Sequence, residues 1–415
     1  MDQRSKDLVR GRLADPAWLV RANPRLVIAS LESAADRTQL VAAAVYRTSA
    51  HLHQGSSPAV RRQLLSLDAA RIGDRALAAK LSEVPVDGEP AALWRVRWVG
   101  GPQSDPRLAR AASGRTGEVL AVASAAAPSR KVAVSGIDDG TLRIWDLVTG
   151  KPIGDPVVGH SECVLAVAGA VRERRLVAVT GSDDGVLRMC DVLTGLPVGE
   201  PLIGHAAPVR ALAVSMTEGR PLAVTGSWDQ TVRVWDLSAD RPVGRVLIGH
   251  DAEIWAVAIT DMYGRATAVT GSGDNTARIW DVADAEQVGK PLIGHRGPVH
   301  TVATAQLEGR PVAVTGSWDR TLRIWDLRNG RHLGTILPGH EDLRWAVTAG
   351  RFGGRTIAAT GGGDGRVRIW NLATRERIGP DLVFPAAVRA LATAPGDRLV
   401  VGFGREVAVL SPGPG

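Results

Sequence analysis

Cysteine, lysine and long hydrophobic runs are scarce in this chain of 415 residues. The shortage of cysteine and the lack of long hydrophobic runs each exclude a class of protein. The two cysteines, Cys163 and Cys190, are too few for a disulfide framework and are typical of a reducing compartment. No apolar run reaches the roughly 18 residues of a membrane helix, and the charged start is not followed by the apolar core of a secretory signal. We therefore expect a cytoplasmic protein with no membrane insertion.

The positive charge is carried almost entirely by arginine. The chain has a net charge of +7 and a pI near 10, with 50 basic residues of which only five are lysines. The surplus is spread over the first 90 residues and the remainder instead of forming a cluster. A nucleic-acid groove needs basic residues gathered on one face, so we do not expect nucleic acid to be the main partner.

The familiar catalytic motifs are also missing. The sequence contains no GxxxxGK[ST], HExxH, GxSxG or CxxC pattern. The glycine-rich stretch at 359–370 has the composition of a hairpin turn and not of a phosphate-binding loop. We therefore expect no enzymatic activity and no cofactor or metal ion.

What the chain does contain is a period of 45 residues. The segment GSWDQTVRVWDL at 226–237 returns as GSWDRTLRIWDL at 316–327, and Gly-His pairs recur every 45 residues without insertion or deletion. The pairs end at His160, His205, His250, His295 and His340. A fixed period of this length indicates repeated units that each bury an apolar face against the next.

One unit reads as four short strands. In the unit after His205, strand-like segments cover 209–215, 221–227, 231–237 and 242–249, separated by turn-forming residues. A sheet that is apolar on both faces must be covered on both, and radial stacking of such sheets does this. The repeats therefore predict an all-β propeller.

The repeated motifs resemble those of the WD-repeat (WD40) family. The copies after His205, His250 and His295 have Gly-His, then Thr-Gly-Ser-x-Asp, then Trp-Asp, as in Thr225 to Asp236, and the other copies keep most of these residues. The resemblance implies a structural network of histidine, hydroxyl, aspartate and tryptophan in each blade. Its predicted members are His205, Thr225, Asp229, Trp235, His250, Thr270, Asp274, Trp280, His295, Thr315, Asp319, Trp325, His340, Thr360, Asp364 and Trp370.

The same residue types could suggest a Ser-His-Asp hydrolase or a metal site. We reject both interpretations because the set recurs in every unit, whereas an active site occurs once and metal ligands must meet at one ion. The recurring arginines two residues before each tryptophan position are equally consistent with a scaffold role.

The ends of the chain predict how the ring closes. The last repeat, at 386–410, supplies only three strands, while LWRVRWV at 93–99 alternates apolar and charged residues as a half-buried strand does. WD-repeat proteins often complete the last blade with an N-terminal strand. We therefore predict a seven-bladed propeller over 93–411, closed by the strand 93–99, with a tail at 412–415.

Apolar residues recur at helical spacing in the part of the chain before the propeller. Residues 1–84 predict a small all-α module of about five helices, with Asn23-Pro24 and Ser57-Pro58 as N-cap and first-turn proline, and 85–92 predicts a linker. A helical module followed by WD repeats resembles the arrangement in bacterial STAND-type signalling NTPases, in which such a module precedes the propeller. The resemblance implies a sensor or autoinhibitory role toward a P-loop NTPase, in cis or from a neighbouring gene.

Some tryptophans are not explained by the repeat. Trp228 and Trp318 precede turn aspartates, and Trp255 and Trp345 follow a Gly-His histidine by five residues, so we expect two exposed pairs, Trp228 with Trp255 and Trp318 with Trp345. Aromatic and arginine side chains are enriched in binding hot spots. The candidate partner-binding face is Trp228, Trp255, Trp318, Trp345, Arg210, His300 and Arg389. We expect a non-enzymatic scaffold that binds a protein or peptide there; packing of these rings over neighbouring blades is the structural alternative.

Overall fold

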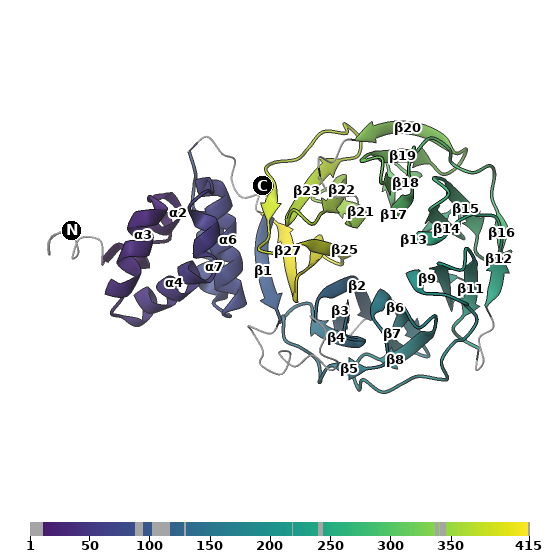
Figure 1. The fold of residues 1–415 in the computed structure, drawn as a ribbon, viewed down its shortest axis with the longest axis horizontal. Helices are drawn as coiled ribbons and strands as arrows, with labels where there is room; N and C mark the ends of the chain where they lie inside the picture. The colour runs from purple at the N-terminus through teal and green to yellow at the C-terminus, as the bar shows by residue number, and fades with distance from the viewer. Residues whose placement is uncertain are drawn as a thin grey trace.

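The computed structural model describes residues 11–87, 94–101, 117–127, 130–217, 219–239, 244–336, 340 and 346–413. These form a group of short helices followed by seven antiparallel sheets, which Figure 1 shows arranged radially around a central axis. The seven-bladed propeller with a small helical module, expected from the repeats, is therefore confirmed.

The helical module lies outside the ring. Its helices are η1 (Gly11–Ala14), α2 (Pro16–Arg21), α3 (Pro24–Ser30), η2 (Leu31–Ser33), α4 (Arg37–Thr48), α5 (Ala50–His53), α6 (Pro58–Arg71) and α7 (Arg75–Glu83). The predicted caps are present: Asn23 Oδ1 accepts a hydrogen bond from Arg25 N at 3.0 Å, and Ser57 Oγ accepts one from Val60 N at 3.4 Å. Each cap satisfies a first-turn N–H that has no partner within the helix.

The first four blades follow one another along the chain. Blade one is β2 (Val119–Ala127), β3 (Arg130–Ile137), β4 (Thr141–Asp146) and β5 (Val157–Val158); blade two is β6 (Val164–Arg172), β7 (Arg175–Ser182) and β8 (Leu187–Asp191). Blade three is β9 (Val209–Thr217), β10 (Arg220–Ser227), β11 (Val232–Asp236) and β12 (Arg245–Leu247); blade four is β13 (Ile254–Met262), β14 (Arg265–Ser272), β15 (Ala277–Asp281) and β16 (Glu286–Gln287).

The last three blades close the ring. Blade five is β17 (Val299–Leu307), β18 (Arg310–Ser317), β19 (Leu322–Asp326) and β20 (Arg331–Ile336); blade six is β21 (Ala346–Phe352), β22 (Arg355–Gly361), β23 (Arg366–Asn371) and β24 (Leu382–Val383). Blade seven is β25 (Val388–Ala394), β26 (Arg398–Phe403), β27 (Glu406–Pro412) and β1 (Trp94–Gly100). The outermost strand β1 pairs antiparallel with β27, so the two ends of the propeller meet in one sheet.

Blade two departs from the expected four strands. Its outer edge consists of isolated bridges, Leu187 with Leu202 and Cys190 with Pro197, instead of a continuous strand. This edge is still hydrogen-bonded to β8, since Leu202 N donates to Leu187 O at 2.8 Å and Val198 N donates to Met189 O at 2.9 Å.

Neighbouring blades enclose apolar cores, because the second strand of each blade is buried on both faces. In β10 every residue after Arg220 is buried, and Val224 packs with Ile254 and Trp280 between blades three and four. Gly226 is required for this close approach, since a Cβ built there would lie 2.4 Å from Cγ2 of Ile254. The Thr-Gly-Ser motif therefore sets the distance between blades.

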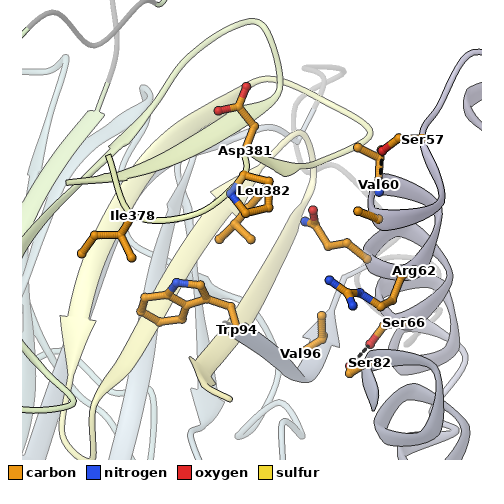
Figure 2. A pocket seen from close by; sticks show the side chains of 13 residues that line it. Ser57, Val60, Arg62, Ser66, Ser82, Trp94, Val96, Ile378, Asp381 and Leu382 are labelled. Carbon is orange, nitrogen blue, oxygen red and sulfur yellow. Dashed lines mark hydrogen bonds between the residues drawn. The ribbon is translucent and has the colours of Figure 1, made fainter. Parts of the chain in front are cut away.

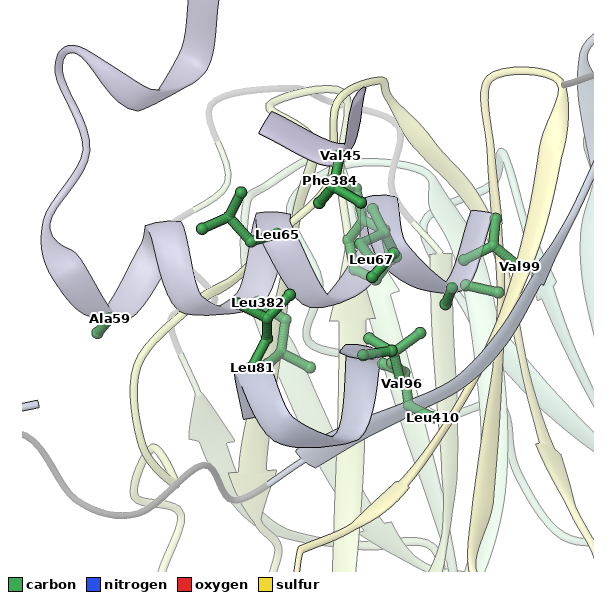
Figure 3. Packing of buried hydrophobic residues seen from close by; sticks show 14 of the residues in the cluster. Val45, Ala59, Leu65, Leu67, Leu81, Val96, Val99, Leu382, Phe384 and Leu410 are labelled. Atoms are coloured by element: carbon green, nitrogen blue, oxygen red, sulfur yellow. The ribbon is translucent and has the colours of Figure 1, made fainter. Parts of the chain in front are cut away.

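The helical module packs directly on the closing blade. One continuous cluster of buried side chains joins the helices to blades six and seven, and Figure 3 shows members of it from the helices, such as Leu67 and Leu81, and from the closing blade, such as Val96. Val86 of the predicted linker takes part, since it is buried in this cluster together with Val84 at the end of the predicted helical module. Residues 88–92 of that linker, residue 93 of the predicted strand and residues 414–415 of the predicted tail lie outside the described residues.

Candidate functional site

The repeated polar residues form one hydrogen-bonded chain in each of four blades. In blade three, His205 Nδ1 lies 2.8 Å from Asp229 Oδ2, His205 Nε2 lies 2.8 Å from Thr225 Oγ1, and Trp235 Nε1 donates to Thr225 Oγ1 at 2.9 Å. Blades four, five and six repeat the arrangement on His250, Thr270, Asp274, Trp280, His295, Thr315, Asp319, Trp325, His340, Thr360, Asp364 and Trp370.

The protonation state of this chain follows from its surroundings. Burial lowers the pKa of the His205 and His295 imidazoles below the usual range. Burial by itself would raise the pKa of the Asp229 carboxyl, but hydrogen bonds from Thr231, the Ala206 N–H and His205 outweigh it and lower the pKa to about 2. A neutral imidazole beside a carboxylate must donate from Nδ1, so its Nε2 accepts from the threonine hydroxyl. Each hydrogen bond from aspartate through histidine and threonine to tryptophan therefore joins one donor to one acceptor.

Blade two carries a fifth version of the network without tryptophan. His160 lies 3.0 Å from Asp184 and 2.8 Å from Thr180, and Cys190 occupies the indole position. Arg188 Nη1 donates to Asp184 Oδ2 at 2.8 Å, as Arg368 does to Asp364 at 3.0 Å in blade six.

The local sequence explains why the arginine takes part in only some blades. Blades three to five have a threonine two residues after the turn aspartate, and its hydroxyl donates to that carboxylate, as from Thr231 to Asp229 at 2.6 Å. Blades two and six have Val186 and Arg366 at this position, so the arginine donates to the carboxylate instead. The recurring arginine is thus a scaffold residue in these two blades.

The network contains buried side chains that are already hydrogen-bonded to one another. The imidazole and hydroxyl of each set are buried, and the indole closes the chain from the neighbouring strand. Within the part of the chain that the structure describes, no three His, Cys, Asp or Glu side chains are grouped so that they could hold a metal ion. The chemistry of these residues is that of a stabilising network.

The tryptophans outside the network form a continuous row across three blades. The rings of Trp228 and Trp255 lie 5.5 Å apart at 61°, and those of Trp255 and Trp318 lie 5.8 Å apart at 54°. Both geometries are within the range favoured by aromatic pairs. Trp255 lies near the start of β13, whereas Trp228 and Trp318 lie in the turns that follow β10 and β18. The Trp255 indole therefore bridges the turns of both neighbouring blades. We call Trp228, Trp255 and Trp318 the tryptophan row.

The predicted pairing is therefore only partly correct. Trp228 and Trp255 are neighbours as expected, but Trp255 also contacts Trp318, so the two pairs are not separate. Trp255 and Trp318 are half-buried and not exposed as expected, while Trp228 is 38 % exposed. Trp255 has a ring packed on either side of it. Trp345 lies outside the described residues.

Arg210 lies over two rings of the row. Its guanidinium lies 5.5 Å from the ring centre of Trp228 and 5.4 Å from that of Trp255. These distances allow cation–π attraction to both rings. His300 lies half-buried at the corresponding position on β17, and the exposed Arg389 on β25 forms an ion pair with Glu118 across the closure of the ring, with 3.1 Å between Nε and Oε2.

A glycine that sequence reasoning missed makes room for the central indole. Gly273 in blade four stands where Trp228 and Trp318 stand in blades three and five. A Cβ built at Gly273 would lie 3.5 Å from Trp255 Nε1 and 2.7 Å from Glu253 Oε2. The alternation of tryptophan, glycine and tryptophan along the turns was the available signal, because a bulky side chain at the middle turn would displace Trp255.

Comparison with known families agrees with this architecture. Five segments match the family model described as WD domain, G-beta repeat, at residues 109–146, 196–236, 242–281, 286–326 and 330–371. No curated protein matches the chain significantly. None of the described helices is long and apolar enough to cross a membrane. The chain therefore carries WD40 repeats and folds as a seven-bladed propeller.

Proposed function

We propose that this chain is a non-enzymatic scaffold that binds a protein or peptide on the propeller face that carries the tryptophan row. The observation that supports the proposal is the contact of three indoles from three blades with one another. Tryptophan and arginine are the residue types most enriched in binding hot spots. A row of rings held on strand ends loses little conformational entropy when a partner binds.

The chemistry of the row favours a particular kind of partner segment. Trp228 offers an exposed ring edge for an aliphatic or aromatic side chain. Arg210 holds a positive charge over two rings of the row, so a carboxylate on the partner would be attracted to the same place. The expected segment therefore combines a large apolar side chain with a neighbouring Asp or Glu.

Selection from a random peptide library displayed on phage tests this proposal. Peptides selected on the wild-type protein are measured against the double variant Trp228→Ala/Trp318→Ala and against Tyr263→Ala. Tyr263 is 78 % exposed in the turn after β13, at the opposite end of that strand from Trp255, so it is a matched aromatic control on the other face.

We expect the double variant to weaken binding of the selected peptides at least tenfold and Tyr263→Ala to leave it unchanged, with melting temperatures within about 2 °C of wild type. Selected peptides that bind the double variant as tightly as the wild type would show that the row is only blade packing.

A regulatory role is the second candidate, and the docking of the helices favours it. The helical module contacts the strand that closes the propeller, so events on the propeller and on the helices can influence each other's stability. In this role the chain is the sensor part of a signalling system of the STAND type, and the P-loop NTPase is encoded in cis or in a neighbouring gene. Co-purification of such an NTPase from the native cells distinguishes this role from a scaffold without one.

A further inference from the structure

The helical module covers part of the outer edge of the propeller. A cavity of about 70 Å³ lies between the two, and Figure 2 shows Val60 and Ser66 of α6 on one side of it and Trp94 of β1 on the other. Nearby, the Gln63 amide donates to Val383 O at 2.9 Å and accepts from Val383 N at 2.7 Å. The outer edges of blades six and seven are therefore in contact with helices of the chain itself.

Elsewhere on the outer edge, exposed aliphatic side chains recur in four consecutive blades. Val158, Ile203, Ile248 and Ile293 stand 45 residues apart, each two residues before the histidine of a Gly-His pair, and each is at least 74 % exposed. Each lies where the outer edge of one blade leads into the next blade. A single exposed aliphatic side chain needs no explanation, so the groups around each of the four decide which of them could bind a partner.

The backbone holds Ile293 outward. Leu292, the preceding residue, is only 2 % exposed and exchanges hydrogen bonds of 2.7 and 3.3 Å with Ala277 at the start of β15. Side chains alternate between the two sides of an extended segment, so Ile293 cannot turn inward while Leu292 fills the core. The exposure of Ile293 is therefore fixed by the blade.

A guanidinium from the next blade lies beside this position. A Cβ built on Gly294, the residue after Ile293, would lie 2.8 Å from Arg323 Nη1, so the half-buried Arg323 of β19 packs on this backbone. Within the residues that the structure describes, Arg323 Nε has no hydrogen-bond partner and the side chain forms no ion pair. Burial lowers the pKa of the His332 imidazole, and the charge of Arg323 lowers it further. The charge of Arg323 is therefore available to a carboxylate from outside.

At the two preceding blade boundaries the equivalent arginine is already engaged. Arg233 Nη1 donates to Gly244 O at 3.3 Å in blade three, and Arg278 Nη1 donates to Gln287 Oε1 at 2.7 Å in blade four. The boundary between blades four and five therefore differs from its neighbours in the state of its arginine.

The residues three positions before and after each isoleucine also differ. They are Glu200 and Ala206 around Ile203, Arg245 and Asp251 around Ile248, and Lys290 and Arg296 around Ile293. Lys290 and Arg296 are exposed, and neither forms an ion pair with any part of the chain that the structure describes. We call Ile293, Lys290, Arg296 and Arg323 the Ile293 surface, which is an aliphatic side chain surrounded by cations.

The carboxylates nearest in the chain do not neutralise this surface. Asp319 accepts a hydrogen bond of 2.9 Å from Arg296 N, and its other oxygen bonds are those of the blade-five network. Glu286 is exposed, but it lies on β16 at the opposite end of β15 from Ile293. A negatively charged group that approaches the Ile293 surface therefore meets a positive potential.

We propose that the Ile293 surface binds an acidic segment of a partner protein, with a Leu or Ile side chain on Ile293 and flanking Asp or Glu carboxylates on Arg296 and Arg323. Guanidinium groups form strong charge-assisted hydrogen bonds with carboxylates, and opposite charge on the two partners gives specificity. An aliphatic side chain at the centre offers no ring on which a base could stack, so a protein segment is favoured over nucleic acid.

This surface is separate from the partner-binding face proposed above. The two are neighbours, because Arg296 N donates to Asp319, the residue after Trp318. The Ile293 surface nevertheless contains no member of the tryptophan row, and its charge does not depend on the row. Binding at either place can therefore be lost without the other.

Fluorescence anisotropy with a labelled synthetic peptide tests the proposal on the full chain. The probe is the acidic peptide EELDELDEE, and its neutral counterpart is QQLNQLNQQ, in which every carboxylate is replaced by an amide. We expect the acidic peptide to bind saturably at physiological ionic strength and the neutral peptide to bind at least about tenfold more weakly.

Variants locate the binding. Ile293→Ser, Arg296→Gln and Arg323→Gln should each weaken the acidic peptide about fivefold or more. Ile293 and Arg296 are exposed, so their variants should keep the melting temperature of wild type even if Arg323→Gln does not. Ile248→Ser is the matched control, because Ile248 is 82 % exposed at the same position of blade three, and Trp228→Ala is the control for the tryptophan row. Both controls should bind as wild type does.

Four results would overturn the proposal. They are no saturable binding to wild type, equal binding of the neutral peptide, an equal loss in Ile248→Ser, and an equal loss in Trp228→Ala, which would assign the peptide to the row. A labelled single-stranded oligonucleotide that binds more tightly than the peptide and is weakened by Ile293→Ser and Arg296→Gln would replace the protein segment by nucleic acid.

Discussion

Arg71 and Glu406 form a bidentate ion pair that is buried where α6 meets β27. Arg71 Nε lies 2.9 Å from Glu406 Oε1, and Nη2 lies 2.6 Å from Oε2. The two side chains are only 5 % and 9 % exposed, and Arg71 also contacts Asp68 on its own helix. The helical module and the propeller are therefore joined by buried charges as well as by apolar packing.

Removing one member of this pair should be costly. Glu406→Ala leaves a buried guanidinium with less compensation, so we expect the free energy of unfolding in urea to fall by about 3 kcal/mol. Glu83→Ala is the control, because its ion pair with Arg95 is largely exposed and should contribute less than about 1 kcal/mol. Equal losses in the two variants would contradict a special role for the buried pair.

The repeated networks predict that the protein loses stability in acid. The pKa values of His205 and His295 are lowered on folding, so the unfolded chain binds protons more readily than the folded chain as pH falls below the usual histidine range. Asp229 and Asp319, each with a pKa of about 2, contribute stability that is present above the unfolded pKa and is lost as pH falls through the folded pKa. We expect the urea midpoint to fall steadily from pH 7 to pH 4. A midpoint that stays constant over this range would exclude the neutral histidines.

Asp68 should show the opposite trend. Burial raises the pKa of its carboxyl to about 6, although Arg71 and the Ser49 hydroxyl act to lower it. The folded chain therefore holds this proton more tightly, and the contribution of Asp68 to stability declines as pH rises from about 4 to about 6. The free energy of unfolding of wild type minus that of Asp68→Asn should fall over this window. A difference that rises with pH would show that the charge of Arg71 affects the pKa of Asp68 more strongly than burial does.

Gly226 tests how closely the blades approach. Gly226→Ala places a Cβ 2.4 Å from Ile254 Cγ2 in the next blade, so we expect a loss of about 2 kcal/mol in the free energy of unfolding. Adding Ile254→Val should restore part of this loss if the contact is its cause. Gly159→Ala is the control, because a Cβ there meets nothing within 4 Å.

The period of 45 residues was sufficient to predict the repeated four-stranded units, and the resemblance to the WD-repeat family supplied the residues of the repeated network. Trp94 to Gly100 could be assigned to the closing blade because its alternation matched the strand that residues 386–410 lacked. These predictions rest on local pattern, on counting and on the way WD-repeat proteins often close their ring, none of which depends on the angle at which blades pack. The irregular edge of blade two was not predicted, because Pro197 and Pro201 stand where Pro152 and Pro156 stand in blade one, which does form its outer strand.

Contacts between repeats could not be predicted to the same degree. Trp228 beside Trp255 followed from adjacent blades, but the contact between Trp255 and Trp318 depends on the reach of one indole over two turns and on the space left by Gly273. The same holds for Arg71 and Glu406, which are 335 residues apart in the chain. No pattern within either segment indicates the other.

The sequence by itself determined that this chain folds as seven repeated sheets, because glycine, aspartate and tryptophan recur at fixed spacing and each unit can bury its apolar faces only against another. Only the tertiary structure decided that Trp228, Trp255 and Trp318 form one row, that α6 docks on the closing blade with a buried ion pair to β27, and that a cavity lies between the helices and that blade. The physical reason is that burial and distance between remote segments arise from three-dimensional packing, whereas periodicity is a property of neighbours along the chain.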